Sequence, residues 1–281
     1  SLGAHPALND AELKELSVAI LPLPGGEFYH FGTSRELVSS TLAIQNSVYD
    51  QRQIMHRKLK PNPAIFVQNA AIDYAFTGAN SNIWIENSHV HQAWKLRTAH
   101  IITGVPRNDW HLALPDGVCL DIVPLKQGGW AVRPYGYDDA FSGHLANHDT
   151  LYLSKPFVHW LAERGISLQA FGTKISDLQA AAIFPVVRNV AQMEAVIRWM
   201  INEPTLFEGK QLWMEAERLS ADEISACADL KALYQQRKQY SKENLSTLAT
   251  NYERSVFYQL DLEDVAQQYT HFGLPKPALL P

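Results

Sequence analysis

Cysteine is scarce in this chain: Cys119 and Cys227 are the only two among 281 residues. That shortage excludes a disulfide framework and a cysteine-rich zinc site, and it suits a reducing compartment such as the cytoplasm. Long apolar runs are also lacking, since no stretch of the sequence approaches the ~18 to 20 residues that a membrane-spanning helix needs. We therefore expect a cytoplasmic protein without a membrane partner.

Positive charge is in short supply as well. Lysine and arginine total 24 against 29 aspartates and glutamates, which gives a formal net charge of −5. Because binding to nucleic acid usually requires a basic face, no nucleic-acid partner is expected. Glycine-rich phosphate loops are missing too: no G-x-G occurs, and the glycine pairs are Gly25-Gly26 and Gly128-Gly129. The chain alone is therefore predicted to be catalytically inactive toward nucleotides.

What the sequence does contain is a repeat with a step of 18 residues. Two series of apolar residues keep this step: Ile65, Ile83 and Ile101, and further along Phe76, Trp94 and Leu112. Helical repeats need about 33 to 47 residues per unit, so the step is too short for them. It fits three short strands joined by tight corners, which form one coil of a parallel β-helix. The alternative is an antiparallel meander in which the spacing is a coincidence.

The repeat also predicts which side chains face inward, because side chains along a strand alternate between its two faces. The predicted interior stack consists of Ile65, Ile83 and Ile101 beside Val67, Ile85 and Thr103. Phe66 and Trp84 then face outward and need a cover. Asn69 and Asn87 fall at the corners, where asparagine tolerates left-handed backbone angles.

Residues 1–55 are expected to form an α/β segment. A helix near Asn9, a strand over 18–21 and a second strand from Phe28 to Phe31 make up most of it. Residues 47–63 follow as a polar, basic connector that ends in two prolines, which marks a plausible boundary.

The end of the second strand is a candidate binding site. Gly32 ends the strand, and Thr33 or Ser34 caps the helix that follows. With Thr33 as the cap, Glu36 completes a capping box. A helix that begins after a strand presents unpaired backbone N–H groups, which favour an anion such as a phosphate. His30 and Thr33 add neutral donors that suit sugar hydroxyls; the alternative is that Thr33 or Ser34 is only a cap.

Four histidines lie in or beside the repeat: His89, His91, His100 and His111. His89 and His91 are two apart, so on a strand they share one face. Such a pair suggests a metal site or the general base of an acyltransferase, but no convincing further metal ligand stands nearby in the sequence. Solvent-facing histidines are the preferred expectation.

From about residue 149 the apolar pattern becomes helical. Ser154 is predicted to cap a helix that ends at Gly165. Asp177 is predicted to begin a helix that Pro185 ends or kinks.

The rest of this region is predicted to be helical too. One helix carries the apolar residues of the range 193–200. Ser220 and Glu223 form a capping box at the head of another helix, which runs through Leu233. Asp261 caps the last segment.

Several of these stretches together resemble a known family. They are Gly26 to Leu37, Ile83 to Ser88, Arg133 to Asp139, Leu212-Trp213 and Arg218 to Ile224. They are similar to L-fucose-1-phosphate guanylyltransferases, and to the middle of the bifunctional form that joins fucokinase and guanylyltransferase in one chain. The resemblance runs over most of the sequence from the first strand to the last helices. A solenoid alone is shared with many sugar-nucleotide enzymes and acyltransferases.

The resemblance implies a reaction in which GTP and L-fucose 1-phosphate give GDP-L-fucose and pyrophosphate, with Mg²⁺, in fucose salvage. It implies a left-handed parallel β-helix with 18-residue coils over residues 56–148. Residues 1–55 would be the C-terminal edge of a nucleotidyltransferase α/β domain, and residues 149–281 an α-helical linker region.

The resemblance also implies partners. Sugar phosphate and GTP or ATP are the expected ligands of the parent enzyme, and an N-terminal catalytic domain and a C-terminal kinase domain are expected beyond this chain. Because the sequence opens at Ser1-Leu2 without a methionine, we expect a middle fragment of such a protein. Fucokinase activity is expected of the parent, and a homo-oligomer stays open.

The site residues that the resemblance implies are His30, Gly32, Thr33 and Ser34, at the edge of the sugar-phosphate pocket. No catalytic residue is assigned. In the wider sugar-nucleotidyltransferase group the equivalent turn often reads Asp-x-Gly-Thr with the aspartate on the metal, and here His30 stands in that place. Mg²⁺ prefers oxygen ligands, so no metal ligand is assigned either.

Two other functions stay open. A solenoid acyltransferase would use His89, His91 or His100 as its base, with a cofactor groove between the coils. A non-catalytic scaffold or assembly domain of another sugar-nucleotide enzyme would need no catalytic residue at all.

Overall fold

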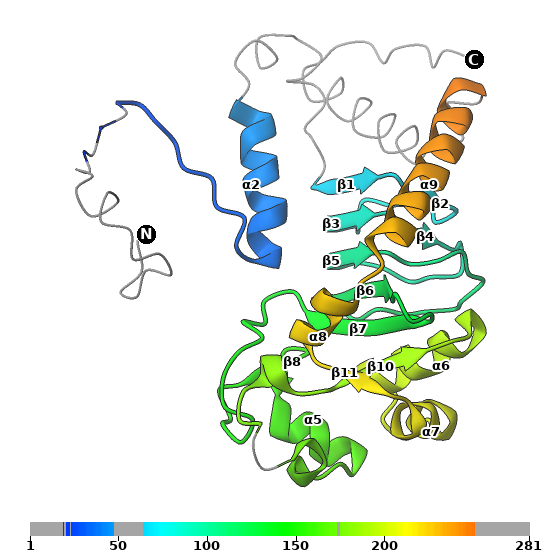
Figure 1. Cartoon of the computed structure of the whole chain (residues 1–281). Helices are drawn as coiled ribbons and strands as arrows, with labels where there is room; N and C mark the ends of the chain where they lie inside the picture. The colour runs from blue at the N-terminus through cyan, green and yellow to red at the C-terminus, as the bar shows by residue number, and fades with distance from the viewer. Residues whose placement is uncertain (1–18, 20, 23, 48–63, 173–174, 251–281) are drawn as a thin grey trace, which may run out of the picture.

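The computed structural model describes residues 19, 21–22, 24–47, 64–172 and 175–250 (Figure 1). The helix expected near Asn9, most of the strand over 18–21, most of the connector 47–63 and the segment at Asp261 lie outside these residues. Within the described part of the chain, no helix is both long and apolar enough to cross a membrane.

Strands dominate the first half of the described chain and helices the second. In chain order the elements are α2 (Ser34–Ser47), β1 (Ile65–Gln68), β2 (Ala71–Ile72), β3 (Ser81–Glu86), β4 (His89–Val90), β5 (Thr98–Thr103), β6 (Val118–Pro124), β7 (Trp130–Gly136), β8 (Leu151–Tyr152), β9 (Lys155–Pro156), α5 (Phe157–Arg164), η1 (Leu168–Phe171), η2 (Leu178–Ala180), β10 (Phe184–Val187), α6 (Val190–Ile201), α7 (Phe207–Glu215), β11 (Arg218–Leu219), α8 (Ala221–Cys227) and α9 (Leu230–Thr250). A seven-stranded sheet has the order β1-β3-β5-β6-β7-β10-β11, and two small pairs, β2-β4 and β8-β9, complete the strands.

The repeat forms a parallel β-solenoid of about three turns, as predicted. Strands β1, β3, β5 and β6 pair in parallel, each with the next, which excludes the antiparallel meander. In the first step Ile65 lies opposite Ile83, a shift of 18 residues. The corner residues Asn69 and Asn87 have φ values of 47° and 51°, the left-handed conformation that was predicted for them.

The predicted interior stack is wrong at the third coil. Ile83 lies opposite His100, and Ile85 lies opposite Ile102, so this coil is one residue shorter than the step of 18. A slip of one residue turns every side chain of a strand to the other face. Ile102 therefore faces the interior, and Ile101 faces outward instead of stacking on Ile83. Because Ile101 and Ile102 are adjacent, a step of 18 residues from Ile83 also ends on an isoleucine, and the sequence alone does not reveal the shorter step of 17.

Helix α2 covers the outward face of the first coils. A separate apolar cluster forms there, consisting of Val38, Phe66, Trp84, Ile101, Cys119 and Tyr137. The rings of Phe66 and Trp84 lie 5.5 Å apart, and Val38 is the buried residue that α2 contributes. Figure 1 shows this helix standing beside the strands. The predicted cover for Phe66 and Trp84 is confirmed.

After β6 the chain turns back and the sheet continues in antiparallel order. β7 pairs with β6 from end to end, and β10 then pairs with β7. The main apolar core includes both Ile65 of the first coil and Ala228 after the last short helix, so the two halves share one core. The region after residue 149 contributes strands to the sheet as well as helices.

Three local predictions for this second half are confirmed. The apolar face of α6 is buried, with Met193, Val196, Ile197 and Met200 at 0% exposure. Gly165 ends α5 in the left-handed conformation, with φ of 64°. The capping box of Ser220 and Glu223 is formed at the start of α8.

Other local predictions are wrong. Phe28 to Phe31 form no strand, and the Phe28 side chain is 87% exposed, because no neighbouring strand among the described residues pairs with it. Ser154 caps no helix: it lies in the turn between β8 and β9, and α5 begins at Phe157 behind Pro156. Cap chemistry in the sequence does not distinguish a helix start from a tight turn, since both favour the same residues.

The predicted helices also differ in extent. The helix at Asp177 is only the short 3-10 turn η2, which ends before Ala181, and Pro185 lies in strand β10. The helix headed by Ser220 stops at Cys227, and Leu230 begins a second helix, α9. Leu125 and Ala228 pair as an isolated antiparallel bridge, so contact with the sheet interrupts the helix there.

The buried position of Ile83 gives a direct test of the solenoid. Its side chain is 0% exposed, so replacing it by alanine should lower the free energy of unfolding by ~2 to 5 kcal/mol. Urea unfolding followed by circular dichroism measures this loss. Phe207→Ala is the control, because Phe207 is 76% exposed and its loss should change stability by less than about 0.5 kcal/mol. Equal losses in the two variants would contradict the interior position of Ile83.

Candidate functional site

The start of α2 is built by a complete capping box, as predicted. The backbone N–H of Glu36 donates to Oγ1 of Thr33 at 3.2 Å, and the backbone N–H of Thr33 donates to Oε2 of Glu36 at 2.9 Å. Such reciprocal bonds satisfy donors that a helix start leaves unpaired. Thr33, and not Ser34, is therefore the cap.

The Glu36 carboxylate also takes the donors that were expected to hold an anion. Its Oε2 accepts from the backbone N–H of Gly32 at 3.1 Å and lies 2.9 Å from Nδ1 of His30. Desolvation raises the pKa of Glu36, but the bonds from Thr33 and His30 outweigh it and hold this pKa below its ordinary value. The amide groups before the helix are thus occupied by a charge of the chain itself.

A pocket of about 290 Å³ lies between the start of α2 and strand β7; we call it the α2–β7 pocket. Its lining residues are Gly32, Thr33, Ser34, Arg133, Tyr135, Asp139, Ala140, Phe141 and Phe184. Three of the four predicted site residues meet there. His30 is not among the lining residues, and its contact with Glu36 makes it a support for the cap.

Arg133 is the charged donor of this pocket. It lies opposite Asp121 in the β6–β7 register and donates from Nη2 to Oδ2 of Asp121 at 2.7 Å. Oδ1 of Asp121 accepts from Thr103 at 2.8 Å. Nε of Arg133 is buried and has no hydrogen-bond partner. A buried N–H without an acceptor costs about 1–3 kcal/mol, so this group is suited to an oxygen of a ligand.

Tyr135 and Asp139 complete the polar wall. Burial raises the pKa of Tyr135 above its ordinary value, so its hydroxyl stays protonated and shares a hydrogen bond with Ser34. Burial also raises the pKa of Asp139, although backbone N–H groups of Ser154 and Gly136 bind its carboxylate at 3.0 and 2.9 Å. Asp139 therefore holds the loop after β7 in place beside the pocket.

Sequence reasoning assigned no role to Arg133, Tyr135 or Asp139. The stretch 133–139 is similar to the fucose enzymes, but that resemblance assigned no role to any of its residues. A signal was present: Arg133 and Tyr135 stand two apart on a strand whose other positions are mostly buried, so they share a face. Nothing in the sequence indicated that this face meets the start of α2.

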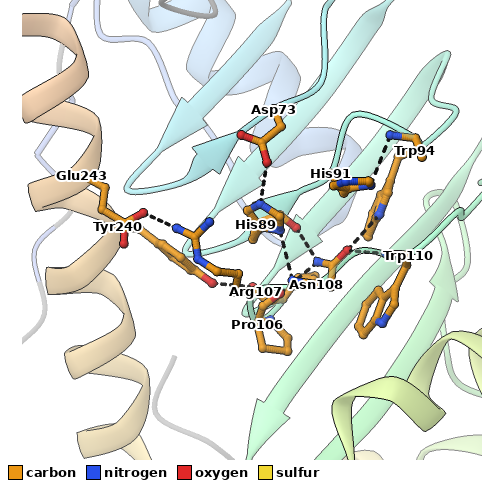
Figure 2. A network of polar contacts seen from close by, with 12 residues as sticks. Asp73, His89, His91, Trp94, Pro106, Arg107, Asn108, Trp110, Tyr240 and Glu243 are labelled. Carbon is orange, nitrogen blue, oxygen red and sulfur yellow. Dashed lines mark hydrogen bonds and ion pairs between the residues drawn. The ribbon is translucent and has the colours of Figure 1, made fainter.

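Two of the four histidines are not the solvent-facing residues that were expected, whereas His111 is exposed as predicted and His91 is half-buried. His89 is 2% exposed and His100 is 0% exposed. Figure 2 shows His89 between Asp73 and Asn108: Nε2 lies 2.9 Å from the Asp73 carboxylate, and Nδ1 accepts from the Asn108 backbone N–H at 3.2 Å. His100 likewise uses both ring nitrogens, toward the Val118 carbonyl and the Arg97 backbone N–H.

This arrangement counts against the acyltransferase hypothesis. A general base needs a ring nitrogen that reaches the substrate proton, and both nitrogens of His89 and His100 are engaged within the chain. The ring of His91 packs near those of His89 and His111, at 6.4 and 6.1 Å between centroids. In the described ranges, no group of three or more histidine, cysteine or acidic side chains is placed to hold a metal ion. Mg²⁺ thus finds no such set of ligands in this part of the chain.

The fold and the pocket define a β-solenoid protein with a small, polar, ligand-sized site on its outward face. Residues 7–189 match the Fucose pyrophosphorylase domain, and the chain belongs to that family. Over all 281 residues it is 54% identical to L-fucokinase/L-fucose-1-P guanylyltransferase of Bacteroides fragilis, and it spans 30% of that protein's length. No solved structure matches the chain.

The buried histidines predict how stability depends on pH. Burial lowers the pKa of His89 and of His100, so both are neutral in the folded chain at pH values where the unfolded chain binds protons. Their contribution to stability is complete above the unfolded pKa of about 6.5 and is lost as the pH falls below it toward the folded values.

Melting temperatures between pH 7.5 and 5.5 test this expectation. The wild-type chain should lose stability as the pH falls, and His100→Gln should show a shallower loss. His111→Gln, at an exposed position, serves as the matched control and should keep the wild-type slope. A melting temperature that stays flat over this range in the wild-type chain would contradict the argument.

Proposed function

We propose that this chain is the solenoid part of an enzyme that makes GDP-L-fucose from GTP and L-fucose 1-phosphate and releases pyrophosphate. The observation that carries the proposal is the 54% identity over the whole chain to a protein named L-fucokinase/L-fucose-1-P guanylyltransferase. Because the chain spans 30% of that relative, the natural protein is proposed to contain further domains, including one that phosphorylates L-fucose with ATP. The reaction belongs to fucose salvage.

The α2–β7 pocket is proposed as the edge of the site for L-fucose 1-phosphate. The pocket volume of about 290 Å³ lies at the small end of the range for ligand pockets, which begins at about 300 Å³. A pocket of this size suits a small sugar phosphate better than a whole nucleotide. The Ser34 hydroxyl offers a hydrogen bond to a sugar hydroxyl. Thr33 Oγ1 donates its proton to Glu36 Oε2 at 3.0 Å, so it can only accept from a sugar hydroxyl. The ring of Phe141 offers an apolar surface on the same pocket.

Arg133 is the group proposed to bind the phosphate. The helix start itself is a poor choice, because the Glu36 carboxylate holds the Gly32 and Thr33 amides and would repel a second anion. The guanidinium of Arg133 carries an unpaired Nε–H, and a guanidinium binds phosphate oxygens with a planar fork of donors. His30 acts as a positioning residue, since its ring helps to hold Glu36 and through it the cap.

The chemistry on GTP is proposed to take place on residues beyond this chain. The sequence contains no glycine-rich phosphate loop, and the described residues offer no metal-binding group. Mg²⁺ would neutralise the phosphates of GTP when bound, and its ligands are expected in the rest of the protein. The cytoplasm is the proposed location.

Activity assays on the 281-residue chain and on the full-length protein test whether the chemistry on GTP requires residues beyond this chain. The 281-residue chain is expected to show no turnover with GTP, L-fucose 1-phosphate and Mg²⁺, or with ATP and L-fucose. The natural full-length protein is expected to catalyse both reactions. Turnover by the short chain in proportion to its concentration would contradict the proposal, and so would a full-length protein without guanylyl transfer.

The role of Arg133 is tested in the full-length protein. Arg133→Lys keeps the charge but loses the fork of donors, so the KM for L-fucose 1-phosphate should rise by about tenfold, the factor that 1.4 kcal/mol represents. The KM for GTP and the melting temperature should stay nearly unchanged. Arg97→Lys, in an exposed ion pair with Asp116, is the matched control.

The variants His30→Ala and Thr33→Val distinguish a residue that supports the helix cap from a residue that contacts the ligand. His30→Ala should alter the KM for L-fucose 1-phosphate only through the cap, with a smaller effect than Arg133→Lys. Thr33→Val should lose about 1 kcal/mol of stability with the cap and should also raise this KM. If neither Arg133→Lys nor Thr33→Val changes the KM for L-fucose 1-phosphate, the α2–β7 pocket does not bind the substrate and its residues have only a structural role.

A further inference from the structure

A polar column crosses the outward face of the solenoid beside the apolar column that α2 covers. Glu86 lies opposite Thr103, and Thr103 lies opposite Asp121, on strands β3, β5 and β6. Arg133 continues the column on β7. These four polar side chains stand in register on one face of the sheet and are not part of the apolar core. Glu86, Thr103 and Asp121 form one wall of a second pocket.

This second pocket lies between the solenoid and the first turns of α9; we call it the α9 pocket. Its volume is about 390 Å³, and its lining includes Glu86, Asn87, Thr103, Asp121, Tyr234 and Arg237. Figure 1 shows α9 running along the side of the solenoid next to the strand ends. The α9 pocket and the α2–β7 pocket share no lining residue, but Asp121 of the one binds Arg133 of the other.

Hydrogen bonds and an ion pair hold helix α9 over this pocket. Nε2 of Gln236 donates to the backbone carbonyls of Asn87 and Gly104 at 2.9 and 3.0 Å. Arg107 forms an ion pair with Glu243 one turn beyond Tyr240, whose hydroxyl donates to the Val105 carbonyl (Figure 2). The pocket is therefore preformed, which lowers the entropy that a ligand loses on binding.

One buried group in this pocket lacks its partner. Asn87 is 8% exposed, and its Nδ2 donates to the Leu233 carbonyl at 3.3 Å. Its Oδ1 is buried and accepts no hydrogen bond. A buried acceptor that is left unpaired destabilises the fold, and such exceptions call for a specific explanation. A hydroxyl of a ligand in the pocket would supply the missing donor.

The opposite wall is apolar and open. Leu230 is 73% exposed and Tyr234 is 53% exposed at the start of α9. The ammonium of Lys238 lies 4.8 Å from the centre of the Tyr234 ring, so a ligand is expected at the other face of that ring. An aromatic ring facing a row of hydrogen-bonding oxygens suits a ring compound with hydroxyls at its edge and C–H groups on its face.

The charges of the α9 pocket favour a neutral ligand. Asp121 is paired with Arg133, and the remaining charges in the lining are those of Glu86 and Arg237, which balance each other. A polyphosphate would meet the carboxylates of Glu86 and Asp121 and be repelled. A neutral hydroxylated ring meets acceptors in the carboxylates and the Asn87 oxygen, and donors in Arg237.

We infer that the α9 pocket is a second carbohydrate site, which binds a neutral hexose. Hydroxyls of the sugar donate to Asn87 Oδ1 and to the Glu86 carboxylate, and its apolar face lies on Tyr234. The site is separate from the α2–β7 pocket, and it binds the hexose whether or not guanylyl transfer occurs. Asp121 connects the two pockets, because it bonds to Thr103 in one and to Arg133 in the other. Only the choice of sugars for the test rests on the proposed function.

Saturation-transfer NMR and calorimetry on the whole 281-residue chain test this inference, with L-fucose, D-mannose and D-galactose as ligands and glycerol as the negative control. At least one hexose should bind saturably and glycerol should not. Tyr234→Ala and Asn87→Gly should each weaken that binding by about tenfold or more, which corresponds to at least one stacked ring or one hydrogen bond. Glycine at position 87 accepts the left-handed backbone without strain, so the fold should survive.

Matched variants keep the result specific. Gln235→Ala, next to Tyr234 but lining a different pocket, should bind hexose like the wild type. Phe207→Ala, at an exposed position outside the lining of both pockets, should also leave hexose binding unchanged. The inference is overturned if none of the hexoses binds saturably, or if Tyr234→Ala and Asn87→Gly bind as well as the wild type at unchanged melting temperature. Failure of GDP-L-fucose synthesis in the full-length assay bears on the proposed function alone.

Discussion

The register between successive coils is the constraint on which the rest of the structure depends. Side chains alternate between the two faces of each strand, so the pairing of Ile85 with Ile102 decides the face of every residue in the third coil. That register places Ile101 in the apolar column under α2 and Thr103 in the polar column beside it. One column binds a helix and the other lines a pocket, and both depend on the shorter third coil.

The second half of the chain holds the end of this sheet in place. The Tyr152 hydroxyl donates to the Pro134 carbonyl at 2.9 Å and so ties the helical half to the strand that carries Arg133. Behind it, the buried guanidinium of Arg164 donates to the carbonyls of Trp199 and Met200 at the end of α6. It also lies 4.5 Å from the Trp160 ring. These bonds satisfy carbonyls that a helix end leaves unpaired, and the positive charge suits the helix dipole there.

Glu36 shows how one side chain shapes both the fold and the site. As the capping-box partner of Thr33 it sets the start of α2, and as an anion it occupies the amides that a phosphate would otherwise use. The capping box was readable from the sequence, because its residues are three apart. Its consequence for ligand binding was not, because the Gly32 and His30 contacts depend on how the chain before the helix folds back.

By itself the sequence determined the local features of this protein. The coil repeat, the left-handed corners at Asn69 and Asn87 and the capping box at Ser220 all rest on residues close together in the chain. Only the tertiary structure decided that Thr33 and Arg133 share a pocket. The tertiary structure also decided that helix α9 packs over the polar column and so forms the α9 pocket. The physical reason is that the spacing of residues within a strand or helix determines which face a side chain occupies. Which segment packs against that face depends on contacts between residues far apart in the sequence.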